Sequence, residues 1–122
     1  MKPGDLLFVY GTLRQGECAD LSIRSGAEFV TSDTINGDIY NLGWYPGVRL
    51  GGDHQVYGDV FKLGDEGLIR SLDSYEGYPS LYDRSVVETK DGLKVWVYTI
   101  NRECGENERI ASGDWLNQEK AA

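Results

Sequence analysis

The chain is poor in the residues that cross-link a small protein or bind a metal. In 122 residues it has two cysteines, Cys18 and Cys104, one histidine, His54, and three prolines. Two cysteines are too few for a disulfide framework, and free cysteines usually pack as small apolar residues. His54 has no cysteine or second histidine at a spacing that would bind a metal. We therefore predict no metal site, and we expect His54 to lie at the surface.

Positive charge and long apolar segments are also scarce. Lys and Arg number 12 against 20 Asp and Glu, so the net charge is −8, which opposes binding to a phosphate backbone. No apolar run approaches the ~20 residues that span a bilayer. Residues 1–5 lack the apolar segment of a secretory signal. We therefore expect a cytoplasmic protein that binds neither nucleic acid nor membrane.

Glycine, in contrast, is abundant, with 16 residues where the usual share is about 7%. Most glycines stand singly between short apolar or aromatic segments, a pattern typical of turns in a sheet-rich domain. A chain of this length buries roughly two-thirds of the surface that its unfolded form exposes, which gives an adequate core without disulfides. Since the sequence has no repeat and no Pro-rich or Ser-rich linker, we predict a single domain over 1–122.

Several segments have the composition of β-strands. Residues 5–10 form a continuous apolar and aromatic run that ends at Gly11, which favours a central strand buried on both faces. Further strands are predicted at 28–34, 37–41 and 56–63. The loop that precedes the last of these carries two aromatic residues, where an ordinary turn would carry none.

One segment has the pattern of an amphipathic helix. Asp65 is a good N-cap, and Gly77 is a residue type that commonly ends a helix. Apolar side chains recur between them at helical spacing, which predicts a short helix from 66 to about 75. A second stretch, 17–24, has a weaker helical pattern. The four apolar positions of the first helix are Leu68, Ile69, Leu72 and Tyr75.

The segment 85–100 is predicted to form a β-hairpin. Asp91-Gly92 favours a two-residue type I′ turn, and the flanking arms are 85–90 and 93–100. Apolar and aromatic residues occupy both faces of the second arm, so both faces of that strand should be partly covered. Strands, an inserted helix and a final hairpin together predict an α+β domain whose mixed sheet curls towards a barrel.

The loop after the first strand is a candidate anion site. Gly11 follows a buried strand, and the backbone N–H groups of the next residues can turn into one concavity that holds a carboxylate or an oxyanion. A strand that ends at a glycine is also compatible with an ordinary turn. The residues alone leave both interpretations open.

Two carboxylates, Asp73 and Glu76, lie in the last turn of the predicted helix. The negative end of the helix dipole disfavours an anion there, and the neighbouring Tyr75, Tyr78 and Tyr82 would partly desolvate Glu76. Both effects raise a carboxyl pKa, which suits a general acid and base. The alternative is that Glu76 is a solvated residue at a helix end, on a chain rich in acids.

Seven short sequence blocks follow one another in a characteristic order along the chain. They are FVYGTLR at 8–14, YPG at 45–47, VYGDV at 56–60, LDSYEG at 72–77, YDR at 82–84, VWVY at 95–98 and SGDW at 112–115. This ordered set resembles the gamma-glutamylcyclotransferase-like family, which includes the plant AIG2-like proteins and the gamma-glutamylamine cyclotransferases. An ordered set of blocks is much more specific than any one of them.

The resemblance implies a fold, an activity and a set of site residues. The fold would be a small mixed β-barrel with short helices. The protein would be a cofactor-independent enzyme of the lyase or acyltransferase class that converts a small-molecule gamma-glutamyl substrate to 5-oxoproline and a free amine. We expect it to act as a monomer. Glu76 would be the acid and base, Tyr82 would lie near the substrate, and the gamma-glutamyl group would be bound by Tyr10, Gly11, Thr12 and Leu13.

The sequence leaves the released amine and the use of the site open. The loop at Trp44 and Tyr45, together with Tyr78, Tyr82 and Trp96, either forms a wall for the amine or packs in the ordinary way. A gamma-glutamyl amine is the broader expectation for the substrate. The alternative functions are a non-catalytic module that binds a gamma-glutamyl or related anionic metabolite, and an adaptor that binds a partner through exposed aromatic residues.

Overall fold

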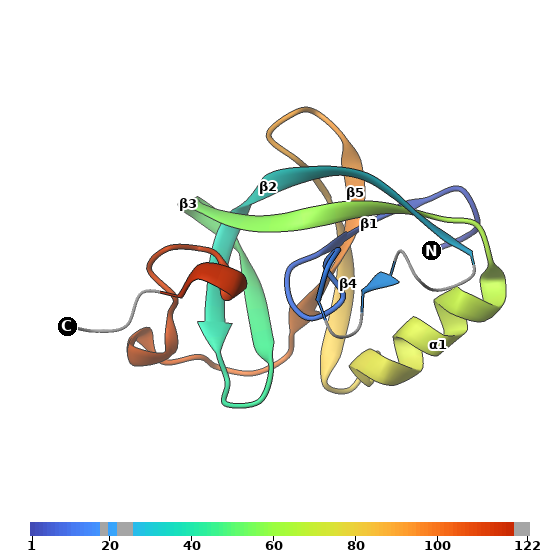
Figure 1. The fold of residues 1–122 in the computed structure, drawn as a ribbon. Helices are drawn as coiled ribbons and strands as arrows, with labels where there is room; N and C mark the ends of the chain where they lie inside the picture. Colours follow the sequence, from blue (N-terminus) through green and yellow to red (C-terminus); the bar gives the residue numbers. More distant parts are fainter. Residues whose placement is uncertain (18–19, 22–25, 119–122) are drawn as a thin grey trace.

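The computed structural model describes residues 1–17, 20–21 and 26–118. Its centre is a five-stranded sheet in the order β2-β3-β1-β5-β4, and one α-helix is inserted between β3 and β4. Figure 1 shows the helix at one end of the sheet, near the N-terminus, and the C-terminal segment at the other end. Its described elements include β1 (Leu6–Val9), β2 (Ala27–Asn41), β3 (Pro46–Leu63), α1 (Glu66–Glu76), β4 (Tyr82–Glu88), β5 (Lys94–Ile100) and the 3-10 turns η2 (Glu106–Glu108) and η3 (Trp115–Asn117).

Strand β1 is the central strand of the sheet, as its apolar run predicts. It pairs antiparallel with β3, where Phe8 lies opposite Val60. On its other edge it pairs parallel with β5, where Leu7 lies opposite Trp96. The sheet is therefore mixed, and the prediction of an α+β domain is confirmed. Because β2 and β4 stand at the two ends of the strand order, the sheet is not closed and the word barrel applies loosely.

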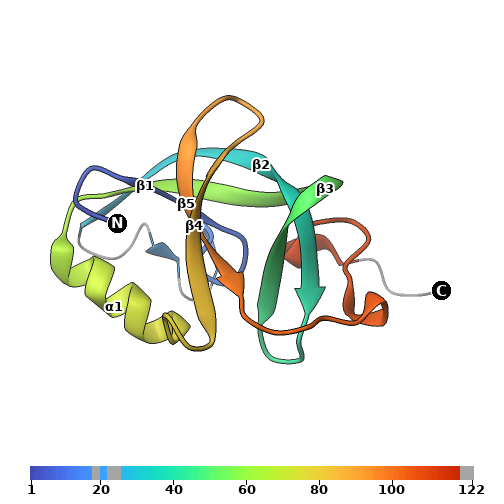
Figure 2. The same ribbon diagram turned by 180° about the vertical axis from the view of Figure 1, so that it is seen from behind.

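Strands β2 and β3 form one long ribbon, which corrects the prediction of two separate strands at 28–34 and 37–41. The Asn36-Gly37 break is a register shift inside β2, so the strand bends there and continues. A Cβ atom on Gly37 would lie 2.7 Å from the carbonyl oxygen of Arg49, so this close approach of the two backbones requires glycine. Both views show the two strands side by side along the ribbon's length (Figures 1 and 2).

The first half of β3 is also absent from the sequence prediction, which begins this strand at 56. The strand begins at Pro46 instead. Residues 49–54 are exposed, so they have no alternation of apolar and polar side chains that would indicate a strand. Arg49 and Leu50 pair with Asp38 and Gly37 of β2, and residues 51–54 fall within the register shift. This long-range pairing is not visible in the local sequence.

Alternating residues of the central strands build two cores on opposite faces of the sheet. Leu7 and Val9 of β1 belong to the first core, together with Leu72 of α1. Phe8 belongs to the second core, together with Ile110 from the segment that follows β5. The helix therefore covers one face, and the bent β2–β3 ribbon with the C-terminal segment covers the other (Figure 2). This double burial explains why β1 has no polar face.

Helix α1 begins and ends at the predicted signals. The carboxylate of Asp65 accepts a hydrogen bond from the N–H of Gly67 at 2.8 Å. Gly77 follows the helix with φ +66°, in the left-handed region, and its N–H donates to the carbonyl oxygen of Ser74. The helix includes Glu76 as its last residue. No described helix is long and apolar enough to cross a membrane. The helical stretch predicted at 17–24 falls mostly outside the described residues.

Strands β4 and β5 form the predicted hairpin, but the turn type is different. A type I′ turn needs positive φ at both central residues. Gly92 has φ +88°, whereas in the described part of the chain no residue other than glycine has a positive φ, so Asp91 does not fit. The N–H of Gly92 donates to the carbonyl oxygen of Thr89, and Thr89 pairs with Leu93. The turn is thus a three-residue loop that ends in a left-handed glycine, and β4 begins at Tyr82 and not at 85.

Candidate active site

A cavity of about 240 Å³ opens where the end of β1, the β2–β3 turn, the end of α1 and the strands β4 and β5 meet. These five segments are separated in the sequence, and the sheet order brings them together. All the residues that the sequence predicts for the site line this cavity. They are Tyr10, Gly11, Thr12, Leu13, Glu76 and Tyr82.

The loop after β1 leaves backbone donors available at the cavity wall. The N–H of Arg14 donates to the carbonyl oxygen of Gly11 at 3.1 Å, which closes a turn directly after the strand. Within the described part of the chain, no hydrogen bond uses the N–H groups of Gly11, Thr12 or Leu13. Buried backbone N–H groups almost always have a hydrogen-bond partner. Donors that lack a protein partner at a cavity wall are therefore available to bind an anion or a carbonyl oxygen of a ligand.

Gly11 is required for a reason other than its backbone angles. Its φ is not in the left-handed region, so any residue could adopt this conformation. A Cβ atom at this position would lie 2.9 Å from Cγ of Pro46, which is closer than such contacts allow. The glycine therefore lets the loop pack against the first residue of β3, and both residues line the cavity.

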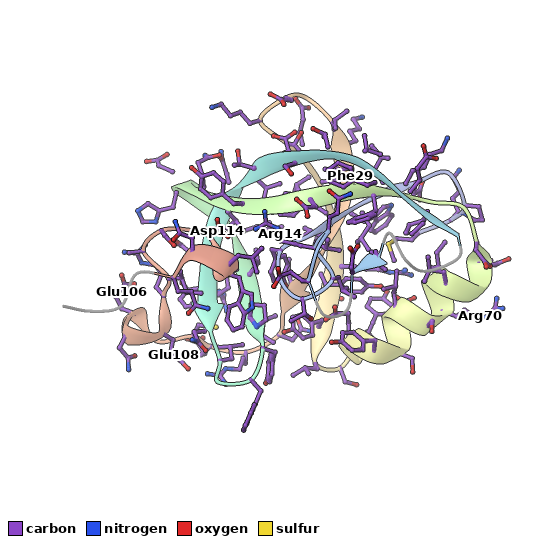
Figure 3. All side chains as sticks on the ribbon, viewed as in Figure 1. Arg14, Phe29, Arg70, Glu106, Glu108 and Asp114 are labelled. Atoms are coloured by element: carbon purple, nitrogen blue, oxygen red, sulfur yellow. The ribbon has the colours of Figure 1, made fainter. Side chains whose placement is uncertain are left out.

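A buried acid ties this loop to the sheet. Asp59 of β3 is 3% exposed, and its carboxylate accepts hydrogen bonds from the N–H of Gln15 at 2.9 Å and from the hydroxyl of Ser32 at 2.8 Å. Arg14 lies 3.5 Å from Asp59 and donates to Asp114 at 2.9 Å. Figure 3 shows Arg14 beside Asp114, which comes from the C-terminal segment. Sequence reasoning missed this cluster, whose one signal is an acid in the apolar VYGDV block.

Glu76 is the carboxylate of the cavity. It is half-buried at the last position of α1, and among the described residues its carboxylate has no hydrogen-bond or ion-pair partner. Burial raises the pKa of Glu76 from the ordinary value of 4.5 to about 7. A carboxyl group with this pKa can both accept and return a proton near neutral pH. The placement agrees with the interpretation of a desolvated acid and disagrees with that of a solvated helix end.

Two tyrosine hydroxyls of the cavity, those of Tyr10 and Tyr82, already donate hydrogen bonds to the protein. Tyr10 donates to the carbonyl oxygen of Tyr98 at 2.6 Å, and Tyr82 donates to the carbonyl oxygen of Pro46. Burial raises the pKa of Tyr82, and the charge of Glu76 raises that pKa further. The pKa of Tyr10 is also raised, chiefly by burial. Both side chains therefore stay protonated and hold the walls of the cavity in place.

Asp73, three residues before Glu76, is fully engaged elsewhere. It accepts a hydrogen bond from the hydroxyl of Tyr98 at 2.6 Å and pairs with Arg84 at 3.1 Å. The Arg84 guanidinium lies 4.4 Å from the ring centre of Tyr78 and 5.6 Å from that of Trp96. Neither of these aromatic residues lines the cavity. The interpretation that they form a wall for the released amine is therefore wrong, because they pack on this cation.

The remaining candidate side chains lie away from the cavity. His54 has a 62% exposed side chain whose Nδ1 is 2.6 Å from Oδ1 of Asp38, so it lies at the surface as predicted. Cys104 is partly buried against the first core, and burial raises the pKa of its thiol. Cys18 is outside the described residues. In the part of the chain that the structure describes, no group of three or more acid, His or Cys side chains could hold a metal ion.

Comparisons with known proteins converge on one family. A family model described as "Gamma-glutamyl cyclotransferase, AIG2-like" matches residues 7–117. The gamma-glutamylcyclotransferase family protein YtfP of Escherichia coli is 31% identical over 115 residues, which cover 93% of this chain and 98% of the relative. Human gamma-glutamylaminecyclotransferase is 33% identical over 98 residues, 70% of this chain and 61% of the relative. The crystal structure of an AIG2-like protein from Mus musculus superposes with a TM-score of 0.71 at 25% identity, over 98% of this chain and 87% of the other.

Proposed function

Since this chain belongs to the AIG2-like gamma-glutamyl cyclotransferase family, we propose that it converts a gamma-glutamyl amine or gamma-glutamyl peptide to 5-oxoproline and the free amine. The observation that carries the proposal is that one cavity holds the Glu76 carboxyl group, with a pKa of about 7, and the N–H groups of the Gly11–Leu13 loop. Among the described residues, neither has a hydrogen-bond partner. The Glu76 carboxyl group can transfer protons, and the N–H groups of the loop can donate hydrogen bonds to oxygen atoms of the substrate.

The substrate supplies its own nucleophile. The nitrogen of the α-amino group attacks the carbon of the side-chain carbonyl and closes a five-membered lactam, and the bond from that carbon to the amine nitrogen then breaks. The products are 5-oxoproline and a free amine, and no water is consumed. Holding the gamma-glutamyl chain in its folded form gives a large advantage to such a cyclisation, up to about 7–11 kcal/mol in well-oriented cases.

Glu76 would carry the proton in both directions. Its carboxylate takes a proton from the α-ammonium group, which frees the nitrogen lone pair for attack. The resulting carboxyl group then gives this proton to the leaving amine as the bond to carbon breaks. The ring nitrogen loses a second proton, which the released amine takes up, so the lactam is neutral and the amine leaves as an ammonium ion. A pKa of about 7 suits both steps, because the group is then neither too weak a base nor too weak an acid.

The loop after β1 would bind the oxygen atoms of the substrate. The N–H groups of Gly11, Thr12 and Leu13 can donate to the α-carboxylate or to the carbonyl oxygen, whose negative charge grows during attack. Asp59 and Arg14 hold this loop from behind, so the donors need little reorganisation when the charge develops. Tyr82 and Pro46 form the adjacent wall through their own hydrogen bond.

The charges of the cavity favour an amine over an amino acid as the leaving group. Among the described lining residues there is no Lys, Arg or His. A gamma-glutamyl dipeptide would bring a second carboxylate into the cavity without a cation to pair with it, and an unpaired charge in such a site is costly. A gamma-glutamyl amine lacks this carboxylate and is the substrate class that we propose.

The direct test is to incubate the protein with a panel of gamma-glutamyl amines and dipeptides and to measure 5-oxoproline. We expect turnover of at least one amine and loss of turnover in Glu76→Gln. Binding of 5-oxoproline without turnover of any compound would instead support a non-catalytic module that uses the same donors to hold an anionic metabolite. If the protein neither binds nor turns over any of these compounds, the proposal that this cavity takes gamma-glutamyl compounds is contradicted.

A further inference from the structure

Uncovered aromatic surface is concentrated at the mouth of the cavity. Three aromatic side chains are largely exposed in the described part of the chain: Trp44 at 96%, Tyr75 at 59% and Tyr57 at 45%. The two most exposed of them, Trp44 and Tyr75, line the cavity that holds Glu76. They come from different elements, the β2–β3 turn and the last turn of α1. We call this pair the aromatic mouth.

Folding does not explain the indole of Trp44. The turn that carries it is closed by the N–H of Leu42, which donates to the carbonyl oxygen of Tyr45 at 3.0 Å. It is also held by the N–H of Gly43, which donates to the side chain of Asn41 at 2.9 Å. An indole that is 96% exposed adds almost no buried surface to the core. Such turn positions usually carry small polar residues, so the indole is available for a ligand.

The leaving group must pass the aromatic mouth. If the reacting carbonyl is held near Glu76 and the Gly11–Leu13 loop, the amine lies on the far side of that carbonyl. Trp44 and Tyr75 are the most exposed aromatic residues of the cavity lining, so they mark the side that faces solvent. In that arrangement, the part of the substrate that differs from one gamma-glutamyl amine to another would lie against these rings.

The walls offer aromatic faces and few polar groups to this part of the substrate. The hydroxyls of Tyr10, Tyr82 and Tyr98 donate to other protein groups. Glu76 is the acid among the described lining residues and is used by the reaction, so no second carboxylate lines the cavity to pair with an additional ammonium group. Rings that stack on such faces gain more than an aliphatic chain of similar size.

We infer that the substrate is the gamma-glutamyl derivative of an aromatic amine, whose ring stacks on the Trp44 and Tyr75 side chains when the gamma-glutamyl group is in the cavity. The inference rests on the proposed function and adds the class of the released amine. Trp44 would act as a specificity residue that binds the leaving group and takes no part in proton transfer. Its removal should therefore change which amines are good substrates and leave the binding of 5-oxoproline unchanged.

The test compares four substrates that share the gamma-glutamyl group. They are the gamma-glutamyl derivatives of benzylamine, cyclohexylmethylamine, ethylamine and 1,4-diaminobutane. We expect kcat/KM for the benzylamine derivative to exceed that for the ethylamine derivative by about tenfold, with the cyclohexyl derivative in between. In Trp44→Ala this ratio should fall to about twofold to threefold. The matched control is Tyr57→Ala, an exposed aromatic residue that does not line the cavity, and it should keep the parental ratio.

Two measurements separate the possible failures. The thermal stability and the 5-oxoproline affinity of Trp44→Ala should match those of the parent, because the side chain is exposed. If no compound of the panel yields 5-oxoproline, the proposed function is wrong. If the amines are turned over with equal kcat/KM, if the diaminobutane derivative is preferred, or if Trp44→Ala keeps the parental ratio, the function stands and the inference of an aromatic amine is overturned.

Discussion

The last turn of α1 faces two regions that treat a carboxylate in opposite ways. On one side, Asp73 is held by the Tyr98 hydroxyl and the Arg84 guanidinium, which itself stacks on aromatic rings. On the other side, Glu76 is half-buried and has no partner among the described residues. A paired carboxylate is explained by the fold that it supports. An unpaired, partly buried carboxylate costs stability, so its presence in a cavity points to a ligand.

The loop after β1 shows the same contrast between groups that have hydrogen-bond partners and groups that lack them. Asp59, behind the loop, has its carboxylate oxygens bonded to the N–H of Gln15 and the hydroxyl of Ser32. In front of it, the N–H groups of Gly11 to Leu13 take no part in hydrogen bonds with the described residues. The protein therefore fixes the loop from one side and leaves its donors free on the other, which is the arrangement that a preorganised binding site needs.

The largest effect on the catalytic rate is expected when the carboxyl group of Glu76 is removed. Glu76→Gln keeps the size of the side chain but cannot accept a proton, so the rate of 5-oxoproline formation should fall by about 10²–10⁴. The affinity for 5-oxoproline should stay within a few-fold, because the loop after β1 is expected to hold the gamma-glutamyl group. Steady-state assays and calorimetric titration of the same preparation check both statements.

Asp73→Asn is the control from the paired region. It removes the ion pair with Arg84 but keeps an acceptor for the Tyr98 hydroxyl, so unfolding should cost about 1–2 kcal/mol less. Its catalytic rate should stay within about tenfold of the parent, since Asp73 does not line the cavity. A variant at Asp73 that abolishes turnover while Glu76→Gln retains it would reverse the assignment of the two acids.

The next effect is on stability as a function of pH. The pKa of Glu76 is about 7 in the folded protein and 4.5 as its ordinary value. Between these values the folded state binds the proton more strongly than the unfolded state, so the stability contribution falls as pH rises from about 4.5 to about 7. The loss is about 3 kcal/mol. Urea unfolding should therefore show Glu76→Gln to be more stable than the parent at pH 8 and similar to it at pH 4.5, and equal stabilities at pH 8 would mean that the carboxyl group is not desolvated.

A smaller effect is expected at the glycine of the loop. Gly11→Ala places a Cβ atom 2.9 Å from Pro46 Cγ, so either the loop or the start of β3 must move, and both line the cavity. We expect the affinity for 5-oxoproline to fall by about tenfold while the fold is retained. Titration of the ligand, with circular dichroism as the check on folding, measures this. Unchanged affinity would mean that the loop does not bind the gamma-glutamyl group.

Local sequence signals predicted the elements that carry their own pattern. The apolar run of β1 gave a central strand, and the Asp65 and Gly77 signals gave both ends of α1. The exposed stretch 49–54 of β3 has no such pattern, because Arg49 and Leu50 are held by pairing with β2 and not by burial. Local patterns therefore find elements that are buried and miss those that are held by long-range pairing.

The candidate site was predictable to a similar degree. The family resemblance named the residues that meet in the cavity. A raised pKa for Glu76 was predicted from the helix dipole and from desolvation, and burial is its cause in the structure. The position of Tyr78 and Trp96 did not follow, because the sequence does not tell which cation or cavity an aromatic residue faces. The tie from Asp59 to Arg14 was also missed, since it joins residues that are far apart in the sequence.

The smallest expected effect lies at the tip of the β4–β5 hairpin, whose residues do not line the cavity. A substitution there compares Gly11 with an ordinary turn glycine. Gly92 has φ +88°, and a Cβ atom there would meet no other atom within 4 Å. Gly92→Ala should therefore cost only the strain of a left-handed residue, about 1 kcal/mol in urea unfolding, and kcat/KM should stay unchanged.

Asp91→Gly then distinguishes the two turn types. In a type I′ turn the variant would gain stability, because that turn needs positive φ at this position. In the three-residue loop Asp91 has a negative φ, so the extra freedom of glycine should instead destabilise the hairpin by about 0.5 kcal/mol.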